Sequence, residues 1–174
     1  RRPCPRVCLF RPSGSATSPV GVRRVVSSPR VDLARLPTTT ELTAKVSLPA
    51  RYVHLPNQFW KHKNHATVIE ALALCKDVVV IATGSKDDYR NPTFYAELME
   101  RVGALGLTDR FRHLGTIGYD ELIALMRDAV AIINPSLFEG WSSTVEEAKS
   151  LAKRVLLSDI AVHPEQAPAR GQYF

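Results

Sequence analysis

Long apolar runs and paired cysteines are both missing from this 174-residue sequence, and each absence excludes a class of protein. The longest uninterrupted apolar runs have five residues, as in 78–82, whereas a membrane-spanning helix needs about 20. The three cysteines show no zinc-ligand spacing and cannot make a disulfide framework, which favours a reducing compartment. We therefore expect a cytoplasmic protein without a membrane span.

Negative charge is absent from residues 1–30, which hold seven arginines and no lysine, aspartate or glutamate. Removing this segment from the chain's 23 basic and 17 acidic side chains leaves 16 basic and 17 acidic ones, a net charge of −1 over 31–174. The formal charge of +6 invites a nucleic-acid partner. Because the arginine-rich segment has a single aromatic residue, Phe10, and no recognised fold, we rank that function last and expect no nucleic-acid partner.

Proline divides the chain into two regions, since eight of the twelve prolines lie in residues 1–56. We interpret residues 1–49 as an irregular or disordered segment rich in arginine, proline and serine, or as the remnant of a linker. A targeting peptide has a similar composition, but the segment shows no amphipathic period. Residues 50–174 are then the folded domain.

Apolar runs alternate with helix-period stretches from residue 52 onward. Strands are predicted at 52–55, 77–83, 111–114, 129–133 and 154–158, and helices near 68–73, 94–105, 119–127 and 143–151. Strands that are apolar on both faces predict an α/β domain, a Rossmann-like parallel sheet with helices on both faces. Ligands of such sheets bind at the carboxyl ends of the strands, so functional residues should follow these runs.

The residues after strand 129–133 have the pattern of a helix start that binds an anion. Ser143 and Glu146 have the spacing of a capping box, and the free N–H groups of a first helical turn attract negative charge. Gly140 and Ser142 leave space for a bulky anion to approach the backbone.

Two glutamates flank this helix start. Glu139 lies just before the predicted helix and Glu147 lies one turn inside it, so the pair could hold hydroxyl groups on either side of a diphosphate. Spacing alone equally allows that the glutamates of the first turn are there only because the helix dipole favours them.

Lysines follow the first predicted strand. Lys61 and Lys63 lie in a loop that leads into a helix, where an ammonium could reach phosphate oxygens. Composition alone favours the alternative, a solvated lysine pair. Phe59 and Trp60 are expected to pack. Neither histidine of this loop, His62 or His65, has metal-ligand spacing, so we expect structural roles for both.

These two loops resemble motifs of one enzyme family. Residues 134–153 (NPSLFEGWSSTVEEAKSLAK) are similar to the E-x7-E region of group 1 (family 4) glycosyltransferases, with Glu139 and Glu147 in the glutamate positions. Residues 57–72 (NQFWKHKNHATVIEAL) resemble the lysine element of that family, with Lys63 in the place of the phosphate-binding lysine. The domain thus resembles the C-terminal, donor-binding half of a GT-B glycosyltransferase.

The resemblance implies retaining, metal-independent transfer of a sugar from a nucleoside-diphosphate donor, with no cofactor. The missing Asp-x-Asp motif agrees with a diphosphate held without metal. Lys63 would neutralise the leaving diphosphate and Glu139 would bind sugar hydroxyls, which makes them the implied catalytic residues. The implied donor-binding residues are Lys61, Gly115, Thr116, Gly140, Trp141, Ser142, Ser143 and Glu147, the last at the ribose.

Two departures from the family pattern shape the expectation. Many relatives have an arginine near Asn57 and Gln58, so Lys61 would have to supply the second positive charge here. The N-terminal Rossmann half and the closing C-terminal helices have no counterpart in the sequence. We therefore expect a truncated domain that is inactive alone. Its parent enzyme would bind a glycan or glycolipid acceptor through the missing half and could associate peripherally with a membrane. The alternative is a non-catalytic nucleotide-sugar-binding domain.

Overall fold

The structure is a computed structural model that describes residues 32–166 and 168–174. The arginine-rich residues 1–31 lie outside this part, and so do the predictions made for them. Among the described helices, none combines the length and the apolar character needed to cross a membrane.

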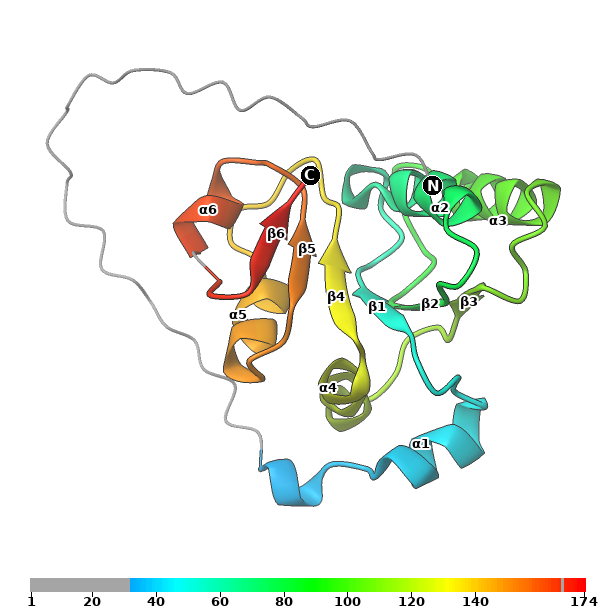
Figure 1. The fold of residues 1–174 in the computed structure, drawn as a ribbon. Helices are drawn as coiled ribbons and strands as arrows, with labels where there is room; N and C mark the ends of the chain where they lie inside the picture. The colour runs from blue at the N-terminus through cyan, green and yellow to red at the C-terminus, as the bar shows by residue number, and fades with distance from the viewer. Residues whose placement is uncertain (1–31, 167) are drawn as a thin grey trace, which may run out of the picture.

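One parallel sheet of six strands organises the fold (Figure 1). The strands are β1 (Val53–Pro56), β2 (Val80–Thr83), β3 (Phe111–His113), β4 (Ala131–Asn134), β5 (Val155–Leu157) and β6 (Gly171–Tyr173). Their order is β3-β2-β1-β4-β5-β6, and every neighbouring pair is parallel. This is the strand order of a doubly wound Rossmann sheet, so the predicted fold class is confirmed.

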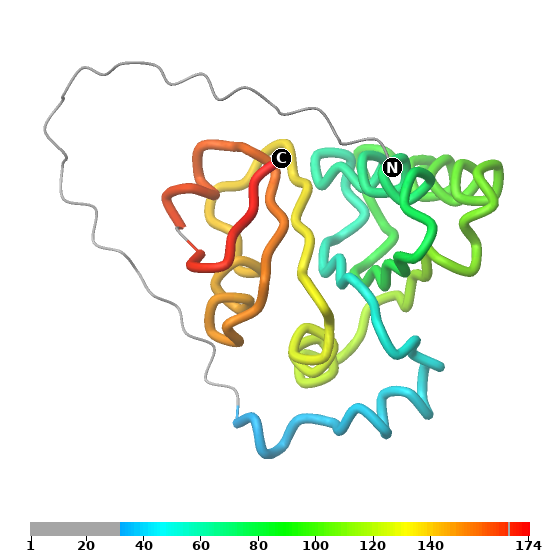
Figure 2. Tube along the Cα trace, in the orientation of Figure 1, coloured from blue at the N-terminus to red at the C-terminus, as the bar shows by residue number. Residues whose placement is uncertain are grey.

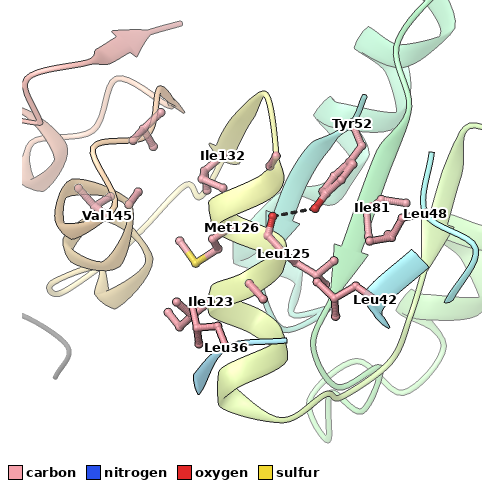
Figure 3. Packing of buried hydrophobic residues seen from close by; sticks show 14 of the residues in the cluster. Leu36, Leu42, Leu48, Tyr52, Ile81, Ile123, Leu125, Met126, Ile132 and Val145 are labelled. Atoms are coloured by element: carbon pink, nitrogen blue, oxygen red, sulfur yellow. Dashed lines mark hydrogen bonds between the residues drawn. The ribbon is translucent and has the colours of Figure 1, made fainter. Parts of the chain in front are cut away.

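Helices cover both faces of the sheet, as predicted. They are α1 (Thr39–Val46), α2 (His65–Leu74), α3 (Phe94–Ala104), α4 (Tyr119–Asp128), α5 (Ser143–Ser150) and α6 (Val162–Gln166), with short 3-10 helices η1 (Leu33–Arg35) and η2 (Lys61–Lys63). One hydrophobic cluster joins α1, α4 and α5 to the sheet, and a second joins α2 and α3. Figure 3 shows the first cluster, in which the Tyr52 hydroxyl donates a hydrogen bond to the Leu125 carbonyl (2.9 Å).

Residues 33–48 are ordered, and the predicted irregular segment does not extend over them. Thr38 caps α1 in a capping box with Glu41, and α1 packs against α4. Leu36, Leu42 and Leu48 are buried in the first cluster. The polar Pro-Thr-Thr-Thr run at 37–40 reads as a loop by composition, but it is the start of this helix.

The predicted strands all begin within three residues of the observed ones, whereas α6 and β6 were not predicted. Both elements are short and carry little apolar sequence. β6 has three residues and pairs with β5 at the edge of the sheet, where one row of backbone bonds suffices without an apolar run.

The chain reverses direction across the sheet between β1 and β4, which are neighbours although β2 and β3 come between them in sequence. The connection after β1 leads to one side of this pair and the connection after β4 leads to the other, which leaves a crevice at their carboxyl ends. Figure 2 shows the two connections side by side, and the Leu137 N–H donates to the His62 carbonyl between them (2.8 Å).

A glycine closes the floor of this crevice. Gly84 follows β2 with φ +135°, and a Cβ placed there would lie 2.5 Å from the Asn57 carbonyl oxygen. No side chain fits at this distance, so Gly84 lets the loop after β2 pack directly on the loop after β1.

Candidate functional site

A pocket of about 310 Å³ lies in the crevice at the carboxyl ends of β1, β2 and β4. Six of the predicted site residues line it: Lys63, Thr116, Glu139, Trp141, Ser142 and Ser143. Four others do not line it: Lys61, Gly115, Gly140 and Glu147. The parallel sheet therefore brings predicted residues together at one edge although they lie up to about 80 positions apart in the sequence.

Lys63 is positioned by the turn between η2 and α2. Asn64 adopts the left-handed conformation (φ 56°) that reverses the chain before α2, and its N–H donates to the Lys61 carbonyl. Its side-chain amide donates to the Pro135 carbonyl (3.2 Å), which attaches the loop after β1 to the loop after β4. Phe59 is fully buried beneath this turn, so the predicted packing role is confirmed.

Lys63 and Glu139 form an ion pair inside the pocket. Lys63 Nζ lies 2.7 Å from Glu139 Oε1, and the two side chains are only 14% and 10% exposed. The Ser136 hydroxyl also lies 2.7 Å from this oxygen, and the Asn134 amide lies 3.5 Å from it. Burial acts to raise the pKa of Glu139, but the hydrogen bonds from Lys63 and Ser136 outweigh it and hold the pKa below its ordinary value. Glu139 is thus a charged hydrogen-bond acceptor.

Asn134, the last residue of β4, is the centre of a buried polar network that the sequence patterns did not reveal. Its Oδ1 accepts a hydrogen bond from Asn57 Nδ2 (3.1 Å) and lies 2.7 Å from the Ser136 hydroxyl. Its Nδ2 donates to Ser142 Oγ (2.9 Å). The available signal was an asparagine at the carboxyl end of each central strand, Asn134 in β4 and Asn57 after β1. These two amides join both walls of the pocket beneath Lys63 and Glu139.

Helix α5 begins one residue earlier than the capping-box pattern predicted. The N-cap is Ser142, whose hydroxyl accepts from the Val145 N–H (3.4 Å), and Ser143 is the first helical residue. Glu146 does not fold back on Ser143, because its buried carboxylate accepts from Lys149 and Gln166. The predicted Ser143–Glu146 capping box is therefore wrong.

Two backbone N–H groups at the start of α5 are available to a ligand. Among the described residues, none accepts a hydrogen bond from the N–H of Ser143 or Thr144, and both residues line the pocket. The Ser142 N–H, by contrast, donates to Gln166 Oε1 (3.2 Å). The first helical turn thus presents the N–H groups of Ser143 and Thr144 at the pocket, and Ser143 belongs to the predicted set of donor-binding residues.

The remaining four predicted residues do not belong to the pocket lining. Glu147 is half-buried on α5, where burial raises its pKa and a hydrogen bond from Tyr119 lowers it by less. Gly115 accepts from the Gly84 N–H through its carbonyl (2.9 Å). Lys61 and Gly140 are exposed.

Trp60, for which packing was expected, lines the pocket, and its indole N–H donates to the Asp87 carbonyl (3.3 Å). His65 is buried and stacks on Phe59 with ring centroids 4.1 Å apart, in agreement with the predicted structural role. Within residues 32–166 and 168–174, no group of three His, Cys, Asp or Glu side chains could hold a metal ion.

Residues 48–170 match the family model of glycosyl transferases group 1. The chain belongs to this family. The resemblance noted in the loops after β1 and β4 is thus confirmed for most of the described domain, and no curated protein is similar enough in sequence to match.

Solved structures share the fold at low sequence identity. A glycosyltransferase from Rickettsia africae ESF-5 superposes with a TM-score of 0.70 at 23% identity, covering 82% of this chain and 39% of that one. Anabaena Alr3699/HepE in complex with UDP gives 0.69 at 19% identity, covering 79% and 39%. The C-terminal domain of a group 1 glycosyl transferase, LpcC, from Francisella tularensis gives 0.63 at 22%, covering 78% and 73%. The chain thus has the fold of one half of a GT-B glycosyltransferase and spans 39% of the length of the first two proteins.

Proposed function

We propose that the pocket binds a nucleoside-diphosphate sugar, and that the domain holds this donor for retaining, metal-independent glycosyl transfer. One observation carries the proposal: the buried Lys63–Glu139 pair shares a pocket, at the point where the sheet reverses, with two N–H groups of α5 that have no acceptor among the described residues. A cation and a helix N-terminus on opposite walls suit a diphosphate, which carries negative charge along its length.

Lys63 retains capacity for a phosphate while it is paired with Glu139. An ammonium group has three N–H donors, and Glu139 is the one described acceptor for Lys63. Two donors thus remain for the phosphate oxygens, and the Ser143 and Thr144 N–H groups face them from α5. All of these donors are fixed before the ligand arrives, so charge that develops on the leaving diphosphate meets preorganised partners.

Glu139 suits the sugar of the donor. Its Oε1 accepts every hydrogen bond recorded for this carboxylate among the described residues, which leaves Oε2 for hydroxyl groups. Because its pKa is lowered, Glu139 stays an acceptor at neutral pH. Glu147 lies one turn inside α5. We assign it to the ribose hydroxyls because it occupies the second glutamate position of the family's E-x7-E region. The Anabaena protein was crystallised with UDP and with UDP-glucose, which makes UDP the first probe for this chain.

Calorimetry with UDP, GDP and uridine tests the proposal. The folded chain should bind one diphosphate nucleotide more tightly than uridine, with the same affinity in the presence of EDTA. Lys63→Met should reduce UDP affinity about a hundredfold, the size of two lost charge-assisted hydrogen bonds, and leave uridine affinity unchanged. A folded chain that binds neither UDP nor GDP would overturn the proposal.

The stereochemistry needs a second measurement. The domain joined to an acceptor-binding half should give a product whose anomeric configuration equals that of the donor, as read by NMR. An inverted product would contradict the retaining mechanism and leave donor binding intact.

A further inference from the structure

Gln166 connects a short peripheral helix to the start of α5. It is the last residue of α6, and its side chain is buried although the helix lies at the edge of the domain. Gln166 does not line the pocket, and its position in the chain, 24 residues after Ser142, gives no hint that the two residues meet. A buried amide needs partners for its carbonyl and for both of its N–H groups, and all three are present here.

Its amide pairs with the backbone of Ser142 on both sides. Gln166 Oε1 accepts from the Ser142 N–H (3.2 Å), and Gln166 Nε2 donates to the Ser142 carbonyl (2.8 Å). Nε2 also donates to Glu146 Oε1 (2.9 Å). The chemistry of these partners fixes the amide orientation, because only the oxygen can accept from an N–H and only the nitrogen can donate to a carbonyl.

Lys149 adds two further hydrogen bonds between α5 and α6. Its ammonium donates to the main-chain carbonyl of Gln166 (2.8 Å) and to Glu146 Oε1 (3.1 Å), so the end of α6 and the middle of α5 share one cation. Ser142 is held independently by Asn134, whose amide donates to the serine hydroxyl. The N-cap residue of α5 is therefore clamped between the end of β4 and the end of α6.

This clamp fixes both backbone groups of Ser142, the residue directly before the two N–H groups of α5 that line the pocket. Because the Ser142 N–H is directed toward Gln166, it is removed from the groups that a ligand can use. The next two N–H groups of the helix, those of Ser143 and Thr144, have no acceptor among the described residues, and both residues line the pocket.

We infer that Gln166 is a positioning residue that orients the first turn of α5 toward the diphosphate of the donor. The inference rests on the proposed function, since it assigns Gln166 a role at the same pocket. A side chain that offers one acceptor and two donors at this spacing is required, so neither Glu nor Met can replace glutamine.

Two variants and a matched control test this role. Gln166→Met removes all three hydrogen bonds. Gln166→Glu keeps an acceptor for the Ser142 N–H and places a second oxygen against the Ser142 carbonyl and Glu146. Gln172→Met makes the same chemical change at an exposed glutamine of β6. Affinity for UDP and for uridine is measured by calorimetry, and hydrogen exchange is followed at residues 140–145.

Both Gln166 variants should bind UDP about tenfold more weakly than the wild type, the size of one misaligned charge-assisted hydrogen bond, and bind uridine unchanged. Exchange at the Ser142 amide should accelerate in Gln166→Met, and Gln172→Met should match the wild type in every measurement. If UDP and uridine affinities fall in equal proportion, or if a folded Gln166 variant binds UDP as the wild type does, the positioning role is overturned. A wild-type chain that binds UDP no better than uridine would instead overturn the proposed function itself, without reference to any variant.

Discussion

The two walls of the pocket are held in place by different forces. The loop after β1, residues 57–64, is anchored by the fully buried ring of Phe59, which packs on His65 (4.1 Å between centroids), His113 (4.3 Å) and Tyr95 (5.1 Å). The loop after β4, residues 135–142, has exposed apolar side chains at Leu137 and Phe138 and is held by hydrogen bonds to Asn134.

The two kinds of contact have different effects: one mainly stabilises the fold, and the other mainly fixes the positions of the atoms that line the pocket. Burial of an aromatic ring is non-directional and contributes a large share of the free energy of folding, so the wall after β1 supplies a firm base for Lys63. Buried hydrogen bonds contribute less net free energy, but they fix the positions of individual atoms. The wall after β4 thus determines where the carboxylate of Glu139 and the N–H groups of α5 point.

Loss of the aromatic anchor should have the largest effect on stability. Phe59→Ala should lower the free energy of unfolding by about 4 kcal/mol, because it leaves a cavity beneath the loop after β1. Urea unfolding followed by circular dichroism measures the change. Phe138→Ala on the other wall is the control: its ring is 69% exposed, so its effect should stay within about 0.5 kcal/mol. Equal losses in the two variants would contradict the proposed difference between the walls.

Breaking the ion pair that joins the walls should have the next largest effect. Lys63→Met leaves the carboxylate of Glu139 buried without its cation and should lower the free energy of unfolding by about 3 kcal/mol. The double variant Lys63→Met/Glu139→Gln should recover most of this loss, since no unpaired charge remains.

A double-mutant cycle from urea unfolding gives the coupling energy of the pair. A loss below about 0.5 kcal/mol in the single variant would mean that solvent screens the pair as it does at the protein surface.

As the pH falls, the buried histidines at and after β1 should lower the free energy of unfolding before Glu139 does. Burial lowers the pKa of His54 and His65 to about 3, against an ordinary value of 6.5. The unfolded chain therefore binds protons below pH 6.5 that the folded chain refuses. Stability is complete above pH 6.5 and falls toward pH 3, by about 1.4 kcal/mol per pH unit for each histidine. The pKa of Glu139 is lowered, so its contribution is present above the ordinary value of 4.5 and is lost only as the pH falls further.

Urea unfolding at pH 7, 6 and 5 measures this slope. His65→Leu should reduce the loss between pH 6 and 5 by about 1.4 kcal/mol, whereas Glu139→Gln should leave the slope unchanged. An identical slope in wild type and His65→Leu would show that His65 titrates normally in the folded protein.

Predictability differed between residues for a physical reason. Lys63 and Glu139 follow central strands at recognisable turns, so sequence placed them at the correct edge of a parallel sheet, where the structure pairs them at 2.7 Å. Lys61 is two positions away from Lys63, yet it is exposed outside the pocket. Both residues lie in the 3-10 helix η2, where side chains two positions apart point in different directions. Asn134 and Ser136 lie in the stretch that resembles the family region, but no role was predicted for them, and their hydrogen bonds to Asn57 and Glu139 became visible only in space.

The sequence by itself determined the strand and helix succession, the parallel sheet, and the two loops that form the pocket, because apolar period and turn residues act over a few positions. It also placed the helix start after β4 to within one residue. The tertiary structure alone decided that Ser142 rather than Ser143 caps α5, that Lys63 is paired with Glu139, and that Gln166 clamps the N-cap from 24 residues away. These contacts join side chains across the sheet and between helices. Their hydrogen bonds depend on distances that no local pattern encodes.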